Sequence, residues 1–179
     1  MSQVALLLPS RLNSAILWIM AAFQIRPLNK GDRDWIARLL EEHWHSTKVV
    51  TRGRIHYADE LPGFIAIQED KPAGLVTYRI DGDECEIVTM DSLAGGVGIG
   101  SALIDAVKDM AVSAKCKRLW LITTNDNTAA LRFYQKRGFS LVAVHRNALE
   151  QSRKLKPEIP LVGINGIPLR DEIELELLL

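Results

Sequence analysis

Residues 127–139 read NTAALRFYQKRGF, and this stretch decides the fold that we predict. Asn127 is of a residue type that caps helices, and it precedes a predicted helix over residues Thr128 to Arg137. Ala130 and Tyr134 are four residues apart, so they share one helix face, on which the small alanine leaves room for a ligand chain to pass. The closing Gly-Phe pair is typical of a helix end in the left-handed conformation followed by a return to the core.

A glycine-rich segment, GGVGIGS at Gly95 to Ser101, stands about 30 residues earlier. It follows a predicted strand and opens a helix whose apolar stripe runs through Ile99, Leu103 and Val107 to about Ala114. Free backbone N–H groups and the positive end of the helix dipole converge at such a start. The segment therefore predicts a phosphate-binding site.

Spacing excludes two common meanings of this loop. The dinucleotide pattern G-x-G-x-x-G fails, because its third glycine falls on Ser101 when Gly96 is first and its second on Val97 when Gly95 is first. The P-loop fails because Ser101 stands where that pattern requires lysine. A nicotinamide dinucleotide or ATP site is therefore not predicted.

The rest of the chain from Ile25 alternates between strand-like and helix-like periodicity, as in a mixed α/β domain. A first strand is predicted at residues 24–27, and a helix over Asp32 to Trp44 in which Asp32 caps the first turn. Residues 47–61 form a polar stretch. Strands are predicted at residues 63–67, 74–80, 84–90, 118–123 and 139–144, then an irregular excursion and a closing strand near 173–177.

The two motifs together resemble the GNAT superfamily of N-acetyltransferases. Gly98 and Gly100 match the small positions of its pyrophosphate loop, Q/R-x-x-G-x-G/A, and residues 127–139 match its N-x-x-A-x-x-x-Y-x-x-x-G-F signature at every fixed position. Gly95 stands where the family usually has Gln or Arg, so a side-chain contact is missing there. The resemblance covers Ile25 to the C-terminus.

This resemblance implies an α/β (α+β) fold with a mixed, mostly antiparallel central sheet of about six to seven strands, flanked by helices and splayed between the fourth and fifth strands. It implies acetyl-CoA as cosubstrate, no metal, and direct transfer of the acyl group to a primary amine. The residues that match cofactor-binding positions are Met90, Asp91, Val97, Gly98, Ile99, Gly100, Ser101, Asn127, Ala130 and Tyr134. Asn127 either contacts the cofactor or only caps its helix.

Transfer to an amine needs a base, because the amine arrives protonated at neutral pH. Glu86 is our candidate, on the fourth strand nine residues before the loop motif, with Glu84 on the same side; the alternative is a solvent-facing carboxylate. By resemblance, a backbone N–H at Met90 or its neighbour holds the thioester oxygen. By resemblance, Tyr134 protonates the departing thiolate, and the alternative is a packing role.

The acceptor is expected to lie against the segment between the first helix and the second strand. That segment carries aromatic and cationic residues that could hold a carboxylate or a flat polar acceptor, or could be a solvated loop: His43, Trp44, His45, Arg52, Arg54, His56 and Tyr57. His43 and His45 are two apart and point away from each other in a helix, which disfavours a metal site. A small-molecule or peptide amine is the expected acceptor, and a homodimer is left open.

Composition limits the partners further. Lys plus Arg number 22 and Asp plus Glu number 22, so no net field gathers nucleic acid or a membrane surface. Cys85 and Cys116 lie in apolar runs and are expected to be buried free thiols of a cytoplasmic protein.

The domain is expected to span residues 23–179, behind an N-terminal extension over residues 1–22. Its apolar run, Leu12 to Phe23, is too short to span a bilayer and lacks the basic flank of an export signal. The extension is either an extra helix or a stretch preceding a true initiator at Met20. A chain beginning at Met20 is expected to fold and to be active.

A second class of function remains open, a noncatalytic acyl-CoA sensor or interaction module on the same scaffold. Gly95 favours that class, whereas Glu86 and Tyr134 favour an enzyme, because a binding module needs neither.

Overall fold

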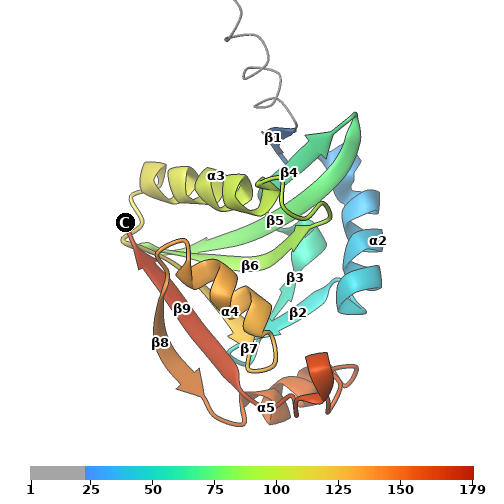
Figure 1. The fold of residues 1–179 in the computed structure, drawn as a ribbon, viewed down its shortest axis with the longest axis vertical. Coiled ribbons are helices and arrows are strands. Elements are labelled where there is room, and N and C mark those ends of the chain that lie inside the picture. The colour runs from blue at the N-terminus through green and yellow to red at the C-terminus, as the bar shows by residue number, and fades with distance from the viewer. Residues whose placement is uncertain (1–22) are drawn as a thin grey trace, which may run out of the picture.

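The computed structural model describes residues 23–179, and the predicted extension over residues 1–22, with Met20, lies outside the described residues. Figure 1 shows a twisted sheet with helices on both faces. The strands are β1 (Gln24–Pro27), β2 (Lys48–Thr51), β3 (Arg54–Tyr57), β4 (Gly63–Gln68), β5 (Lys71–Asp81), β6 (Glu84–Ser92), β7 (Arg118–Thr124), β8 (Ser140–His145) and β9 (Glu172–Leu178). The helices are α2 (Arg33–Trp44), α3 (Ile99–Ser113), α4 (Thr128–Gln135) and α5 (Ala148–Leu155), with short 3-10 turns at Lys30–Asp32, Ala58–Glu60 and Ile164–Gly166.

Seven strands form the main sheet in the order β1-β4-β5-β6-β7-β9-β8. All neighbours are antiparallel except β6 and β7, whose connection through α3 makes them parallel. The predicted class, a mixed and mostly antiparallel sheet of six to seven strands flanked by helices, is confirmed. The predicted succession of three antiparallel strands before the glycine loop is β4, β5 and β6.

Two apolar clusters hold the helices on opposite faces of the sheet. The larger joins α3 and α4 to one face, with Ile99, Leu103 and Val107 fully buried against β5, β6 and β7. The smaller joins α2 to the other face, with Leu40 fully buried against Leu75 of β5. The alternation of side chains along β6 therefore assigns each residue to the α3 face or to the α2 face.

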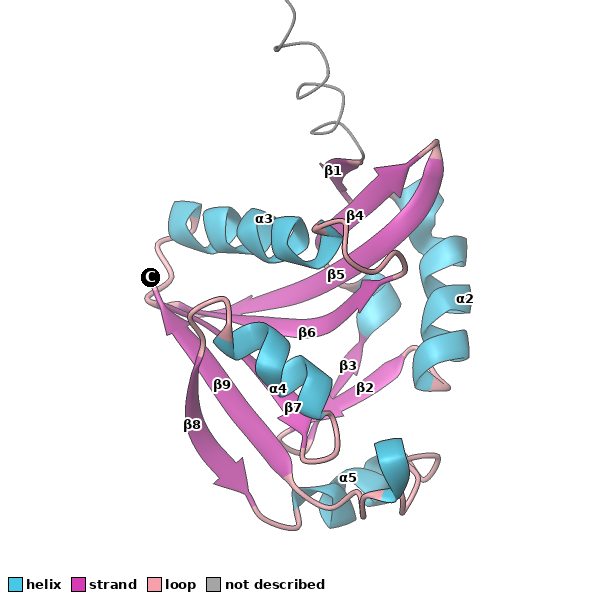
Figure 2. Cartoon of the chain, viewed as in Figure 1, coloured by secondary structure: helices cyan, strands magenta, loops and turns pink. Residues whose placement is uncertain are grey.

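The sheet opens between β6 and β7, as predicted for the fourth and fifth strands of the family's sheet. Their pairing extends only from Glu84 and Arg118 to Ile87 and Leu121. The register of β5 against β6 shifts at Thr77 and Tyr78, which leaves Val88 as an extra residue on β6. Figure 2 shows the two strands starting side by side and then diverging.

The polar stretch at residues 47–61 is not a plain loop, because it contains the hairpin of β2 and β3. Its two-residue turn uses Arg52 and Gly53, both with positive φ, which matches the twist of hairpin strands. The excursion after β8 likewise contains α5, which buries Leu149 and Ser152. Neither element is strongly apolar, so the sequence pattern did not predict them.

Two helix boundaries also differ from the prediction. The carboxylate of Asp32 does not cap α2; it accepts hydrogen bonds from the Asn29 backbone N–H and from Arg26, both Arg26 nitrogens lying at 2.7 Å. α4 ends at Gln135, two residues before Arg137, and Gly138 follows in the predicted left-handed conformation at φ 87°.

Candidate active site

The glycine loop has the shape of an anion cradle. Gly96 and Gly98 have φ of 81° and 91°, a conformation in which only glycine is unstrained. Gly98 caps α3 without a side-chain hydrogen bond, so the first N–H groups of the helix have no capping partner. A Cβ added at Gly95, Gly96 or Gly98 would meet nothing within 4 Å, so space remains for a ligand beside the backbone. These features fit a pyrophosphate on the predicted residues Val97 to Ser101.

The first turn of α3 packs directly against α4. A Cβ added at Gly100 would lie 3.0 Å from the Phe133 ring, so a larger residue would require this ring to shift by a few tenths of an ångström. The Ser101 hydroxyl accepts a hydrogen bond from the Nε of Arg137 at 3.1 Å, and that guanidinium lies 3.5 Å over the Phe133 ring. Arg137 thus puts a positive charge beside the loop that carries Gly95 in place of the family's polar residue. The sequence analysis did not single out Arg137, because no local pattern links it to α3.

β6 carries the predicted residues Met90 and Asp91 beyond its last pair with β7. Their side chains point to opposite faces of the sheet. Met90 packs on the α3 and α4 side, where its sulfur is 3.8 Å from the Tyr134 hydroxyl. The Asp91 carboxylate accepts from His43 Nδ1 and from Trp44 Nε1, each at 2.9 Å, which fastens the end of α2 to the open strand.

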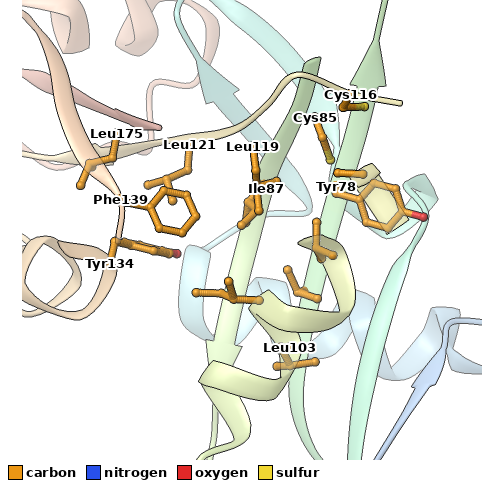
Figure 3. Close-up of a cluster of buried hydrophobic side chains, with 14 of the residues drawn as sticks. Tyr78, Cys85, Ile87, Leu103, Cys116, Leu119, Leu121, Tyr134, Phe139 and Leu175 are labelled. Carbon is orange, nitrogen blue, oxygen red and sulfur yellow. The ribbon is translucent and has the colours of Figure 1, made fainter. Parts of the chain in front are cut away.

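α4 holds the other predicted residues. Asn127 caps the helix, its side-chain oxygen accepting from the Ala130 N–H at 3.0 Å, so the capping alternative is observed. Tyr134 is buried, in edge contact with Phe133 and Phe139. Figure 3 shows Tyr134 beside Phe139 at one end of the buried cluster. Burial raises the pKa of the Tyr134 phenol, with a further increase from Asp91, so the phenol keeps its proton at neutral pH.

Glu86 lies on the α2 face and is not solvent-facing, with 3% of the residue exposed. The Thr51 hydroxyl donates to its carboxylate at 2.6 Å and is also 2.9 Å from His56 Nε2. Since the hydroxyl has a single proton, His56 donates through Nε2 when Glu86 is ionised. Burial raises the pKa of Glu86, although Thr51 and Arg79 oppose the rise; burial lowers the pKa of His56 to about 4.

The structure divides the predicted acceptor cluster between two cavities. One, of about 270 Å³, contains Arg52 and Arg54 together with Glu86 and Glu84. The other, of about 470 Å³, is lined by the end of α2, by β2 and by the segment after α5. Its walls are mainly apolar, and the buried Lys156 closes one side by donating to the Trp44 carbonyl at 2.8 Å. His56 belongs to the Glu86 network, and Tyr57 is exposed.

Thr51, Arg79 and Trp120 are site residues that sequence reasoning missed. Thr51 lies on the hairpin that the sequence pattern did not predict, and Arg79 and Trp120 lie on strands beside Glu86. Strand alternation places Trp120 opposite Glu86 in the β6–β7 register. Arg79 and Trp120 could have been predicted as neighbours of Glu86 only if the pairing register of β6 with β5 and β7 had been known.

Across residues 23–179, no three His, Cys, Asp or Glu side chains lie close enough to hold a metal ion. In the same range no helix has the length and apolar character to cross a membrane.

Comparisons with known proteins agree with this geometry. The family described as the acetyltransferase (GNAT) family matches residues 30–139. A Bacillus subtilis (strain 168) protein named "Uncharacterized protein YdhI" is 45% identical over 150 residues, covering 83% of this chain and 94% of the relative. The fold is similar to that of an IAA acetyltransferase from Bacillus cereus ATCC 14579, with a TM-score of 0.67, 21% identity, and coverage of 88% of this chain and 99% of that one. A GNAT family acetyltransferase from Elizabethkingia anophelis with acetyl-CoA bound gives a TM-score of 0.65 at 21% identity, covering 89% and 99%.

Proposed function

The chain belongs to the acetyltransferase (GNAT) family, and from this premise we propose that residues 23–179 form an N-acetyltransferase domain acting on a small-molecule or peptide amine. The observation that carries the proposal is that β6 carries a buried carboxylate, Glu86, just before it separates from β7 and leads into the glycine cradle at the start of α3. A similar fold binds acetyl-CoA in the Elizabethkingia anophelis acetyltransferase. When bound, acetyl-CoA would supply the acetyl thioester.

The cofactor side consists of backbone donors and one nearby cation. The N–H groups from Val97 to Ser101 would hold the pyrophosphate, with Arg137 beside them. The edge of β6 from Val88 onward has no partner on β7, so the pantetheine arm would run along Met90 and Asp91. Ala130 would leave room for it on α4, next to the Asn127 cap.

The chemistry takes two protons from the nitrogen of the protonated amine, one before attack and one after it, and returns one proton to the thiolate; the proton lost after attack would restore the Tyr134 phenol. Glu86 would take the amine proton, because its buried carboxylate has a raised pKa and is therefore a stronger base than an exposed one. The Met90 N–H or its neighbour would stabilise the thioester oxygen. Tyr134 would donate its proton to the departing thiolate, so the C–S bond breaks as the C–N bond forms, and no covalent enzyme intermediate is needed.

A cytoplasmic location accompanies this proposal. Both cysteines are free and buried, and burial raises the pKa of the Cys85 thiol to about 12, which makes it unreactive. Structural thiols of this kind are usual in a reducing compartment.

The decisive experiment measures thiol release from acetyl-CoA with a panel of amines, beside calorimetric binding of acetyl-CoA. We expect transfer to at least one amine, and for E86Q a loss of about 10²-fold or more in kcat/KM with the acetyl-CoA Kd unchanged. Tight binding without transfer to any acceptor would instead support the sensor.

A further inference from the structure

The cavity beside Glu86 is rich in arginine. Arg52 and Arg54 reach it from the β2–β3 hairpin and Arg79 from β5, while Trp120 of β7 forms another wall. Glu86 lies in its wall on the α2 face of β6. We call this space, of about 270 Å³, the arginine pocket. Its volume suits a small acceptor only.

One exposed carboxylate, that of Asp81, accepts hydrogen bonds from two of these guanidinium groups. The Oδ2 of Asp81 lies 3.3 Å from Arg54 Nη1 and also accepts a hydrogen bond from Arg79 Nη2. Hydrogen bonds from these two arginines lower the pKa of Asp81, so it is ionised at neutral pH. Its side chain is 67% exposed, at the end of β5 beside the turn, and it can therefore turn into solvent.

The pairing of Glu86 is different. Its side chain is 4% exposed, it accepts from Thr51, and its distance to Arg79 Nη1 is 4.0 Å. Arg79 thus spans two acids, a fixed one inside the pocket and a displaceable one at the rim. Arg52 is 3.6 Å from Glu174 and 5.9 Å from the Trp120 ring, so it stands as the third cation at the same pocket.

We propose that the arginine pocket binds the carboxylate of an amino-acid-like acceptor, whose carboxylate takes the place of Asp81 between Arg54 and Arg79 while its amine faces Glu86. This inference rests on the proposed function and names the substrate class of the same site. The acceptor is zwitterionic, with a short chain between its two charges, because a single guanidinium separates the Asp81 position from Glu86.

The charges of the pocket favour such an acceptor over a neutral amine. Guanidinium groups bind carboxylates through charge-assisted hydrogen bonds, which are stronger than neutral ones. An acceptor without a carboxylate offers no group to take the place of Asp81 between the two arginines. An acceptor that carries a carboxylate replaces the ion pairs of Asp81 with equivalent pairs between the substrate and the same two arginines.

The test compares acceptors of closely similar shape with and without a carboxylate. Glycine, β-alanine and 4-aminobutyrate are each assayed against their own amides, which keep the shape and remove the charge. We expect kcat/KM for the best acid to exceed that of its amide by about tenfold or more, since the amide cannot form the charge-assisted hydrogen bonds that a carboxylate forms with guanidinium groups. Calorimetric binding of the same acids to the protein without acetyl-CoA gives a readout independent of turnover.

Two variants locate the effect. D81N removes the competing carboxylate and should lower the KM of the acid by several-fold, while R79Q should bring the acid-to-amide ratio close to one. The matched control is D83N, because Asp83 is an exposed acid two residues away that pairs with Lys117, outside the pocket. It should leave the ratio unchanged. If R79Q loses its melting transition, R54Q carries the same test.

Equal rates for acids and amides, or no effect of D81N on the acid, would overturn the inference. Transfer to other amines in that case leaves the acetyltransferase proposal standing. Calorimetric binding of the acids with no transfer to any amine would support the pocket and reject the enzyme. The two proposals therefore fail separately.

Discussion

Tyr134 has a proposed chemical role and a packing role, and removing its hydroxyl oxygen separates the two. Its ring packs against Phe133 and Phe139, and its hydroxyl donates a hydrogen bond to the Met90 sulfur at 3.8 Å. Y134F keeps the ring and removes the proton donor. We expect kcat to fall by about 10²-fold or more, with less than about a threefold change in the acetyl-CoA Kd.

A matched control exists in the same cluster. Tyr78 is also a buried tyrosine with a raised pKa, and its ring stacks on that of Phe64 with the centroids 6.0 Å apart. Figure 3 shows Tyr78 at the opposite end of the cluster from Tyr134. Y78F should leave kcat within about twofold of the unmodified protein. A kcat for Y134F as high as that of Y78F would remove Tyr134 from the mechanism.

His56 gives the protein a predictable sensitivity to acid. Burial, with Arg79 and Arg54 nearby, lowers its pKa from 6.5 to about 4, so the unfolded chain binds its proton first as the pH falls. The folded state therefore loses stability between pH 6.5 and about 4. Glu86, 3.9 Å away, acts with the opposite sign, because its raised pKa makes the folded state bind a proton more readily at low pH.

H56Q tests this account, because glutamine carries no charge at any of these pH values. Urea unfolding at pH 7 and at pH 4.5 should show that the unmodified protein loses about 2 kcal/mol more of its unfolding free energy than H56Q does. Parallel losses in both proteins would mean that folding does not change the pKa of His56.

At the level of elements, the start of α3 depends on backbone conformation. Gly98 has φ 91° and nothing within 4 Å of an added Cβ, so G98A introduces strain without a clash. Left-handed backbone costs a non-glycine residue about 1–2 kcal/mol. The loop should relax away from the geometry that aims its N–H groups, and acetyl-CoA should bind about tenfold more weakly by calorimetry.

G166A is the control for this change. Gly166 has a similar φ of 73° and equally open surroundings, but it lies in the excursion before β9. The G166A variant should lose about as much unfolding free energy as G98A and should keep the acetyl-CoA Kd of the unmodified protein. Equal weakening of binding in both variants would show that the effect is general and does not arise at the cradle.

For the whole molecule, cofactor binding should stabilise the folded state. α3, β6 and α4 all contribute to the proposed site, so acetyl-CoA binds the folded chain and not the unfolded one. At 100 times its Kd, it should raise the melting temperature by about 5–10 °C. NADH at the same concentration should shift it by less than about 1 °C, and the reverse order of the two ligands would contradict the loop assignment.

Local sequence determined the elements whose signals lie within a few residues of each other. The glycine loop, the Asn127 cap and the Gly138 stop depend on backbone conformations that few residue types adopt, so residues 95–101 and 127–139 predicted their own geometry. The family signature then implied the sheet and its splay, and both are confirmed. The burial of both cysteines also followed from their apolar neighbours.

The tertiary structure decided which distant side chains meet. Three side-chain hydrogen bonds join residues from separate elements: Thr51 to Glu86, Arg137 to Ser101, and Arg54 to Asp81. These contacts depend on strand register and helix packing, which a one-residue shift would change completely. The sequence by itself therefore determined where a cofactor loop begins, whereas the surroundings of Glu86 and the charge of the arginine pocket exist only once the hairpin has folded over β6.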